Sequence, residues 1–323
     1  MNIIEHSDIV AALRAAGIGR GDLVYLQTDL RTIGLIRGAR NSEAACAAYL
    51  AAVREAIGAE GTILVPTFTT QVARYDIDFV WEETPTILGA FPEYLRRRAP
   101  SLRSLHPLHS MTALGPLQEE LCGNNGPHDF GWNSPIHRAF ERGAKTLVIG
   151  LESSFALGTT HQAEVMAGVP YFYNKLLKWV PVVNGRPVDR RYVAAVRYLN
   201  LTVAYDYPKA LRLARSRGLV RSARLGGGWV HAGDYPAIVA LLLEHLRQDH
   251  YWLLRQPPEF EYGVLPFDGP TAGRDGIASG VTVTGAGDMN WSGFYFDRGK
   301  LGGDEADLEA AERTAAGRTA DDS

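Results

Sequence analysis

The segment 159–164 (TTHQAE) places a histidine and a glutamate three residues apart, after a stretch of small residues. If Thr159 caps a helix, His161 and Glu164 lie on one face of that helix. A carboxylate at this distance orients an imidazole and raises its basicity, which a general base needs near neutral pH. The alternative is a solvated histidine beside a capping acid, and these residues alone leave both interpretations open.

Two polar loops follow short apolar runs that are typical of buried strands. Segment 27–34 (QTDLRTIG) follows Leu23–Leu26, and segment 66–69 (PTFT) follows Thr62–Val65. Ligands of open α/β sheets bind at the carboxyl ends of the strands, so both loops are well placed to hold a ligand. For the first loop, the alternative is an ordinary turn rich in polar caps.

Segment 103–110 (RSLHPLHS) contains an arginine, two histidines and two serines. Its alternative interpretation is a polar turn in which a histidine bonds the backbone, which we favour for His109 and leave open for His106. Pro107 prevents ordinary helix geometry between the two histidines, and no HExxH motif occurs, so we expect no metal site. Phosphate-binding loops, dinucleotide-binding glycine motifs and the GxSxG elbow are also absent from the sequence.

Alternating helical and strand patterns position these loops. Strands are predicted over Leu23–Leu26, Thr62–Val65 and Lys145–Ile149, and helices over Ser7–Ala16, Glu43–Ile57 and Pro92–Arg98, with Ser7 and Ser42 as N-caps and Gly17 and Gly58 as ends. This alternation predicts a parallel sheet covered on both faces. In the second half, Asn184-Gly185 indicates a hairpin, Tyr192–Leu199 a strand, and Pro208–Ser216 and Pro236–Leu246 helices. We therefore predict an α/β fold with an antiparallel addition.

Composition narrows the class of protein. The 33 Lys and Arg against 36 Asp and Glu give a net charge of −3, which argues against nucleic acid as a partner. No apolar stretch approaches 18 residues, so we expect no membrane partner. Cys46 and Cys122 are the only cysteines, and the first ten residues lack a signal-peptide pattern, so we expect a cytoplasmic protein.

The end of the chain differs from the rest. Of the 34 glycines, 11 fall within residues 268–323, and Gly299–Ser323 holds seven acids against three bases. Such a segment buries too little apolar surface to offset the entropy cost of ordering. We therefore predict one domain over residues 1–267 and a glycine-rich, acidic, mobile tail over residues 268–323.

Taken together and in order, these segments resemble the antibiotic N-acetyltransferase family, whose best-known members are aminoglycoside 3-N-acetyltransferases. The matching positions are 21–24, 30–34, 61–69, 88–93, 103–107 with Ser110, Ser134-Pro135, 147–151, His161 with Ala163-Glu164, and Pro170-Tyr171. The resemblance covers residues 18–175 well, weakens towards residue 260 and does not extend into the tail.

The resemblance implies a three-layer α/β/α sandwich and transfer of an acyl group, normally acetyl, from coenzyme A to a primary amine. His161 matches the family's general base, with Glu164 beside it, and Asp206 is a further candidate for the acid that orients it. We expect direct transfer in a ternary complex, because neither cysteine has an activating neighbour in the sequence.

The resemblance also implies where acetyl-CoA binds. The expected coenzyme contacts are Thr28, Leu30, Arg31, Thr67, Phe68, Thr69, Ser104 and His106. Thr67, Thr69 or backbone N–H groups are the expected donors to the developing oxyanion. The chain departs from the family at Gln27-Thr28-Asp29, where histidine-serine-serine is usual, and Asp29 brings a negative charge towards an anionic coenzyme.

The acceptor and the partners stay open at this stage. A basic run in the second half (Lys209, Arg212, Arg215, Arg217, Arg221 and Arg224) is either a solvated helix face or a contact for phosphates or an anionic acceptor. We expect a small-molecule amine from an amino sugar, an aminoglycoside or a related biosynthetic intermediate. The alternatives are a non-catalytic binding or scaffold protein that keeps the fold, and an acyltransferase whose donor is held by a carrier protein. The oligomeric state also stays open, with a homodimer among the options.

Overall fold

The computed structural model describes residues 2–98, 100–151, 157–197 and 203–259. The predicted tail over residues 268–323 and the end of the strand predicted over Tyr192–Leu199 lie outside the described residues. Among the described residues, no helix is long and apolar enough to span a bilayer.

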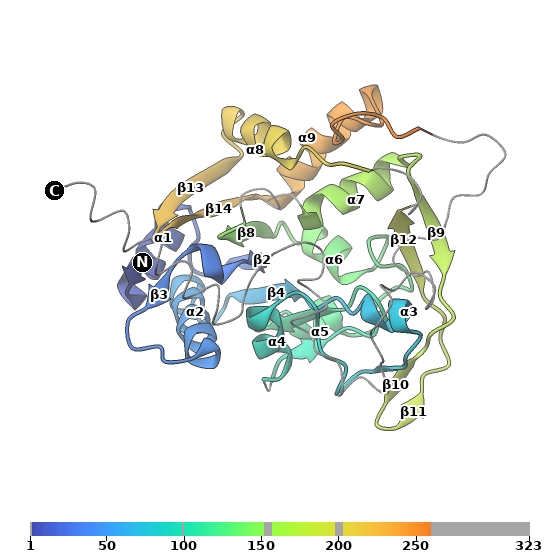
Figure 1. Ribbon diagram of the computed structural model, residues 1–323, viewed down its shortest axis with the longest axis horizontal. Helices are drawn as coiled ribbons and strands as arrows, with labels where there is room; N and C mark the ends of the chain where they lie inside the picture. Colours follow the sequence, from blue (N-terminus) through green and yellow to red (C-terminus); the bar gives the residue numbers. More distant parts are fainter. Residues whose placement is uncertain (1, 99, 152–156, 198–202, 260–323) are drawn as a thin grey trace, which may run out of the picture.

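A seven-stranded mixed sheet forms the centre of the fold (Figure 1). Its strands, in spatial order, are β13 (Val220–Leu225), β14 (Gly228–Asp234), β8 (Lys145–Ile149), β2 (Leu23–Thr28), β4 (Thr62–Pro66), β7 (Met111–Leu114) and β6 (Leu102–Arg103). The three predicted strands are β2, β4 and β8, which run parallel at the middle of the sheet. Antiparallel strands flank them on both sides, β14 and β13 on one and β7 and β6 on the other.

Helices cover both faces of this sheet, which confirms the predicted three layers. One face packs against α1 (His6–Ala15), α2 (Ser42–Ile57) and α4 (Ala90–Arg96), and the other against α5 (Gln118–Cys122), α6 (Pro135–Glu141), α7 (Leu157–Ala167), α8 (Tyr207–Ser216) and α9 (Tyr235–Gln248). Successive residues of a strand point to opposite faces. In β2, Val24 and Leu26 therefore join the first core and Leu23 and Tyr25 the second, which is why the run is apolar throughout.

The helix starts differ slightly from the predicted ones. The N-cap of α1 is Glu5, which forms a capping box with Asp8, so Ser7 already lies inside the helix. Helix α2 is capped by Asn41, whose side chain accepts a hydrogen bond from the Ala44 N–H at 2.8 Å, rather than by Ser42. In both cases a neighbouring polar residue takes the capping role. Gly58 ends α2 as predicted.

A smaller lobe lies beyond one side of the sheet. It comprises α3 (Gln71–Tyr75), β5 (Phe79–Val80), β9 (Phe172–Leu176), β10 (Pro181–Val183), β11 (Arg186–Pro187) and β12 (Val193–Arg197). Strands β9 and β12 pair antiparallel, and β10 pairs with both β11 and β5. The predicted hairpin is confirmed, because Asn184 and Gly185 take φ values of 49° and 72° between β10 and β11. A separate buried cluster around Phe79 and Trp179 holds the lobe together.

The remaining short elements tie the N-terminus to the first loop. Strand β1 (Ile3–Ile4) pairs with β3 (Leu35–Ile36), and a 3-10 turn, η1 (Leu30–Thr32), precedes β3. This pairing fixes the loop that follows β2 at the carboxyl edge of the sheet.

Candidate active site

The loops after β2 and β8 touch at the carboxyl edge of the sheet. The Asp29 N–H donates to the Ile149 carbonyl at 2.8 Å, and the Thr32 hydroxyl donates to the Gly150 carbonyl at 3.0 Å. Gly150 has a φ of 81°, and a Cβ there would lie 2.0 Å from the Asp29 carbonyl oxygen. Only glycine allows this close approach. The two loops are therefore held together where the chain turns towards α7.

Helix α7 carries a histidine and a glutamate in direct contact. The His161 Nδ1 and the Glu164 Oε2 are 2.7 Å apart, at the i, i+3 spacing expected from the sequence. Glu164 is fully buried, whereas 17% of the His161 side chain is exposed. The helix begins at Leu157, so Thr159 lies within it and is not its cap. His161 and Glu164 still lie on one face of the helix, as predicted, because both residues are inside α7.

The geometry of this pair leaves one imidazole nitrogen available. A carboxylate only accepts hydrogen bonds, so in the neutral imidazole of His161 the proton is on Nδ1 and the lone pair is on Nε2. Nε2 has no hydrogen-bond partner among the residues that the structure describes. The rings of Phe130, Phe172 and Tyr205 surround the imidazole at centroid distances of 5.7, 5.6 and 6.0 Å. This enclosure fixes the ring and limits the access of water.

Tyr171 completes the support of Glu164. Its hydroxyl donates to the Glu164 Oε1 at 2.8 Å. Burial, followed by the charge of Glu164 and the hydrogen bond to it, raises the pKa of Tyr171, so the hydroxyl remains a donor. Both carboxylate oxygens are thus engaged, one by each partner. The sequence predicts no role for Tyr171, although its position shortly after Glu164 is the available signal.

Asp206 has a different place in the fold. It is the N-cap of α8, and its side chain accepts a hydrogen bond from the Lys209 N–H at 3.1 Å. No hydrogen bond joins it to His161 in the described part of the chain, where Glu164 takes that position. The role that the sequence suggested for Asp206 as the orienting acid stays a prediction without a contact to support it.

The loop after β2 neutralises its own acidic residue. Arg31 places Nε 2.9 Å from Oδ1 and Nη2 2.8 Å from Oδ2 of Asp29, in a bidentate ion pair. Thr28 ends β2, and Leu30 begins η1, next to this pair. The negative charge that would oppose an anionic coenzyme is therefore compensated within the loop, so these residues remain compatible with a coenzyme A site.

The predicted oxyanion donors after β4 are already engaged. The Thr67 hydroxyl donates to the Ser110 carbonyl at 3.1 Å, and the Thr69 hydroxyl donates to the Pro107 carbonyl at 2.6 Å. Both threonines are fully buried. Between them, Phe68 is partly exposed and packs its ring 4.7 Å from that of His109. The two hydroxyls hold the loop in place, and Phe68 presents its side chain at the edge.

A buried arginine joins the loops around this edge. The Arg103 guanidinium donates to the Thr84 carbonyl at 2.7 Å, to the Trp81 carbonyl at 3.0 Å and to the Ser110 hydroxyl at 3.0 Å. The next residue, Ser104, is also buried, and its hydroxyl accepts the Met111 N–H at 2.9 Å. Segment 103–110 is therefore a tightly bonded turn.

His106 fits the polar-turn interpretation. Its Nε2 lies 3.1 Å from the Val193 carbonyl, and its Nδ1 accepts the backbone N–H groups of Leu108 and His109 at 3.2 and 3.0 Å. This pattern requires a neutral ring with the proton on Nε2. Burial lowers the pKa of His106 to about 4, which agrees with a neutral ring. A contact between His106 and coenzyme A stays a prediction.

The depressed pKa of His106 predicts a loss of stability in mild acid. Between pH 6.5 and 4 the unfolded chain binds a proton at this residue and the folded chain does not, so stability rises with pH in that window. For His106 alone, going from pH 7 to pH 5 lowers the free energy of unfolding by about 2 kcal/mol. Chemical denaturation at both pH values checks this: the His106→Gln variant has a smaller difference between them, and an identical difference contradicts the assignment.

His109 does not bond the backbone as the favoured interpretation had it. Its Nδ1 lies 2.6 Å from the Oδ2 of Asp129, a fully buried carboxylate. Asp129 also accepts the N–H groups of Phe130 and Ala195. Burial opposes the charge, but hydrogen bonds from His109 and His128 hold the pKa of Asp129 well below its usual range. Asp129 was not predicted as a site residue from the sequence, because 20 residues separate it from His109.

Several side chains of the basic run contact residues of the protein itself. Lys209 lies 4.6 Å from the centre of the Trp252 ring, and Arg224 lies 5.0 Å from that of Trp229. The Nε of Arg215 donates to the Ser222 hydroxyl at 3.1 Å. Contacts within the protein therefore explain the positions of these three cationic side chains, and no bound ligand is needed to explain them.

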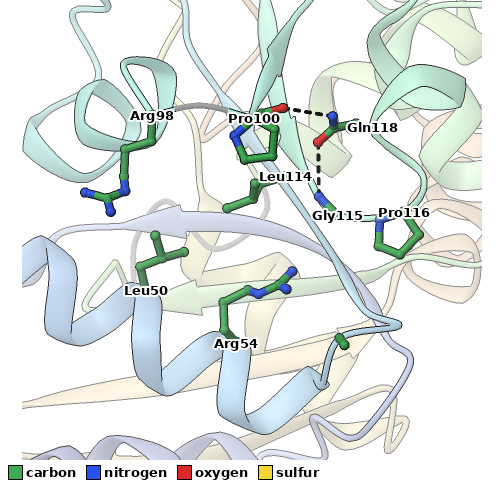
Figure 2. Close-up of a pocket in the computed structure, with 9 residues that line it drawn as sticks. Leu50, Arg54, Arg98, Pro100, Leu114, Gly115, Pro116 and Gln118 are labelled. Carbon is green, nitrogen blue, oxygen red and sulfur yellow. Dashed lines mark hydrogen bonds between the residues drawn. The ribbon is translucent and has the colours of Figure 1, made fainter.

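An open hollow with two arginines lies at the other end of the central strands. Figure 2 shows Arg54 and Arg98 on either side of Leu50 and Leu114, with Gln118 bonded to the Pro100 carbonyl. Leu114 pairs with Ile63, near the start of β4, so the hollow is at the amino end of that strand. It is therefore separate from the edge that carries His161. Among the described residues, no three or more His, Cys, Asp or Glu side chains are arranged so that they could hold a metal ion.

Solved structures share this fold. The aminoglycoside acetyltransferase AAC(3)-Xa superposes with a TM-score of 0.66 at 21% identity, over 79% of this chain and 95% of that one. AAC-IIIb, solved as a binary complex with CoASH, superposes with a TM-score of 0.65 at 19% identity, over 79% of this chain and all of that one. These likenesses confirm the predicted fold.

Sequence comparisons agree with the fold. The chain is 29% identical over 205 residues to the aminoglycoside N(3)-acetyltransferase VIII of Streptomyces fradiae, over 57% of this chain and 68% of that protein. It is 31% identical over 195 residues to an aminoglycoside N(3)-acetyltransferase III of Salmonella sp., over 53% of this chain and 62% of that protein. The family model described as aminoglycoside 3-N-acetyltransferase matches residues 26–247, more than half of the chain. The chain belongs to this family of N-acetyltransferases.

Proposed function

We propose that the protein transfers an acetyl group from acetyl-CoA directly to a primary amine, with His161 as the general base. The observation that carries this proposal is the 2.7 Å contact between the His161 Nδ1 and the buried Glu164. It leaves Nε2 as the basic nitrogen, on a helix at the carboxyl edge of the sheet. Family membership and the CoASH-bound neighbour support the reaction class and the donor.

The proposed step begins with the loss of a proton from the amine. Nε2 of His161 takes this proton as the amine nitrogen attacks the thioester carbon, and the carbon–sulfur bond then breaks to release the thiol. Glu164 stabilises the imidazolium that forms, and Tyr171 keeps Glu164 in place. General base catalysis of this kind typically contributes about 10²- to 10⁴-fold in rate. No acyl-enzyme is needed, because both cysteines are buried and burial raises their pKa values.

The coenzyme contacts follow from the loops at the same edge. We place Thr28, Leu30 and Arg31 against the coenzyme, with Phe68 on the neighbouring loop. The bidentate pair of Arg31 with Asp29 compensates the acidic charge of this loop next to an anionic coenzyme. The contacts expected from Thr67, Thr69, Ser104 and His106 are not part of this proposal, since their side chains are buried and bonded within the protein.

The proposed acceptor is an amine of an amino sugar, an aminoglycoside or a related intermediate. The relatives named above are aminoglycoside N(3)-acetyltransferases, and one solved neighbour of this fold was determined in complex with a gentamicin. The free amine is the nucleophile, so the acceptor must bring an uncharged nitrogen to Nε2.

Incubating the protein with acetyl-CoA and a panel of amino sugars and aminoglycosides tests the proposal, with thiol release as the readout. We expect release that depends on both the amine and the protein. Tight coenzyme A binding in a calorimeter with no release from any amine favours a non-catalytic binding protein instead. Release only from a carrier-bound acetyl donor favours the carrier-protein alternative.

A further inference from the structure

One tyrosine beside His161 has a hydroxyl without a partner. The Tyr205 hydroxyl is buried and makes no hydrogen bond to any residue that the structure describes. The Tyr205 ring meets the imidazole of His161 edge to face, with centroids 6.0 Å apart. A buried polar group without a partner destabilises the folded state, so such groups are rare and call for an explanation. A group that destabilises the fold next to the proposed base suggests a role in the reaction.

The proposed reaction lacks an assigned donor for the acyl oxygen. Attack on the thioester moves negative charge onto that oxygen, and a preorganised donor stabilises it. The hydroxyls of Thr67 and Thr69 already donate to backbone carbonyls, so they do not meet this need. The Tyr205 hydroxyl is free to donate.

The surroundings of Tyr205 keep its hydroxyl protonated and its ring fixed. Burial, followed by the charge of Glu164, raises the pKa of Tyr205 well above 10, against the opposing effect of Arg197. The ring stacks on Tyr207 at a centroid distance of 4.6 Å, and a backbone bridge to Leu254 anchors the residue. The hydroxyl is therefore a neutral donor at pH 7 on a ring that its neighbours hold in place.

We propose that Tyr205 is a catalytic residue whose hydroxyl donates a hydrogen bond to the thioester oxygen during acetyl transfer. The inference rests on the proposed function. As the amine nitrogen bonds to the carbonyl carbon, the π electrons move to the oxygen, which Tyr205 stabilises without giving up its proton. The carbonyl re-forms as the carbon–sulfur bond breaks, and the thiolate takes a proton from the His161 imidazolium.

The variant Tyr205→Phe removes the hydroxyl and keeps the ring. We expect kcat to fall by about 10²- to 10³-fold, as for the loss of one oxyanion donor, while KM for acetyl-CoA changes little. The melting temperature stays equal or rises, because the variant no longer buries an unpaired hydroxyl. A merely structural role predicts no loss of kcat in a fold that is at least as stable.

Tyr49→Phe provides a matched control. The Tyr49 hydroxyl is also buried without a partner in the described structure, but it lies on α2, against the opposite face of the sheet. We expect this variant to have the same kcat as the unmodified protein. Its melting temperature should change as little as that of Tyr205→Phe. A similar loss of kcat in both variants attributes the effect to repacking and overturns the proposal.

A spectroscopic measurement tests the contact without turnover. Acetyl-CoA labelled with ¹³C at the thioester carbonyl is bound to the full-length protein, and the carbonyl stretch is recorded by infrared difference spectroscopy. We expect a shift to lower frequency that Tyr205→Phe reduces and Tyr49→Phe preserves. An equal shift in all three proteins overturns the proposal, whereas a shift that depends on Tyr205 in a protein that acetylates no amine contradicts only the proposed function.

Discussion

Replacing His161 with alanine lowers the rate of acetyl transfer by about 10²- to 10⁴-fold, which is the usual contribution of a general base. The reason is the geometry of the pair: Nδ1 is held by Glu164, and Nε2 is the nitrogen left to take the proton of the amine. Affinity for coenzyme A stays within a few-fold, because the imidazole acts on the acceptor. Steady-state thiol release gives kcat, and calorimetry gives the coenzyme affinity.

His137 offers a matched control for this substitution. It lies on α6, 21% of its side chain is exposed, and its nearest acid is Glu141 at 3.8 Å. We expect His137→Ala to keep the activity of the unmodified protein. Retained activity in His161→Ala removes His161 as the base, and a loss of coenzyme binding in that variant assigns it to donor binding instead.

Replacing Asp129 with alanine lowers the free energy of unfolding by about 3–5 kcal/mol, the usual result of removing one partner from a buried ion pair. The substitution leaves His109 and His128 without their carboxylate and removes the acceptor of the Phe130 and Ala195 N–H groups. Urea denaturation at pH 7 measures the change. A loss below about 1 kcal/mol, the size of an exposed ion pair, contradicts this account.

The charge of Asp129 also predicts a pH dependence. Its pKa in the folded protein lies below the ordinary value near 4, so its contribution to stability is complete above that value and decreases as the pH falls below it. Asp129→Asn keeps the shape but cannot ionise. The unmodified protein and this variant therefore differ less in their free energy of unfolding below about pH 4 than at pH 7. Urea denaturation of both proteins at pH 7 and at pH 3 measures this difference.

Local patterns predicted the centre of the fold. The apolar runs of β2, β4 and β8 are buried on both faces, so their composition alone marks them as central parallel strands. Strands β6 and β7 were missed because two and four residues are too few to show a periodicity. Both also carry polar residues, since Arg103 and Thr112 are bonded inside the edge of the sheet.

In the site, too, the contacts between residues close in the sequence were predicted, and the contacts between distant segments were not. His161 and Glu164 were paired from the sequence because one turn of helix joins them. The contact of His109 with Asp129 joins two loops 20 residues apart, and that of His161 with Tyr205 depends on the packing of α7 against the segment before α8. Whether the Tyr205 hydroxyl finds a hydrogen-bond partner depends on every residue packed around it in the fold, so no sequence motif predicts that it has none.

Chemical rescue of His161→Ala tests the central claim most directly. Thiol release from acetyl-CoA is followed with a fixed amine acceptor at increasing concentrations of imidazole, and a reaction without the amine corrects for acetylation of imidazole itself. The account predicts that imidazole restores amine-dependent release in the variant and leaves the unmodified protein unchanged. Full activity of the variant without imidazole would contradict the assignment of His161 as the base.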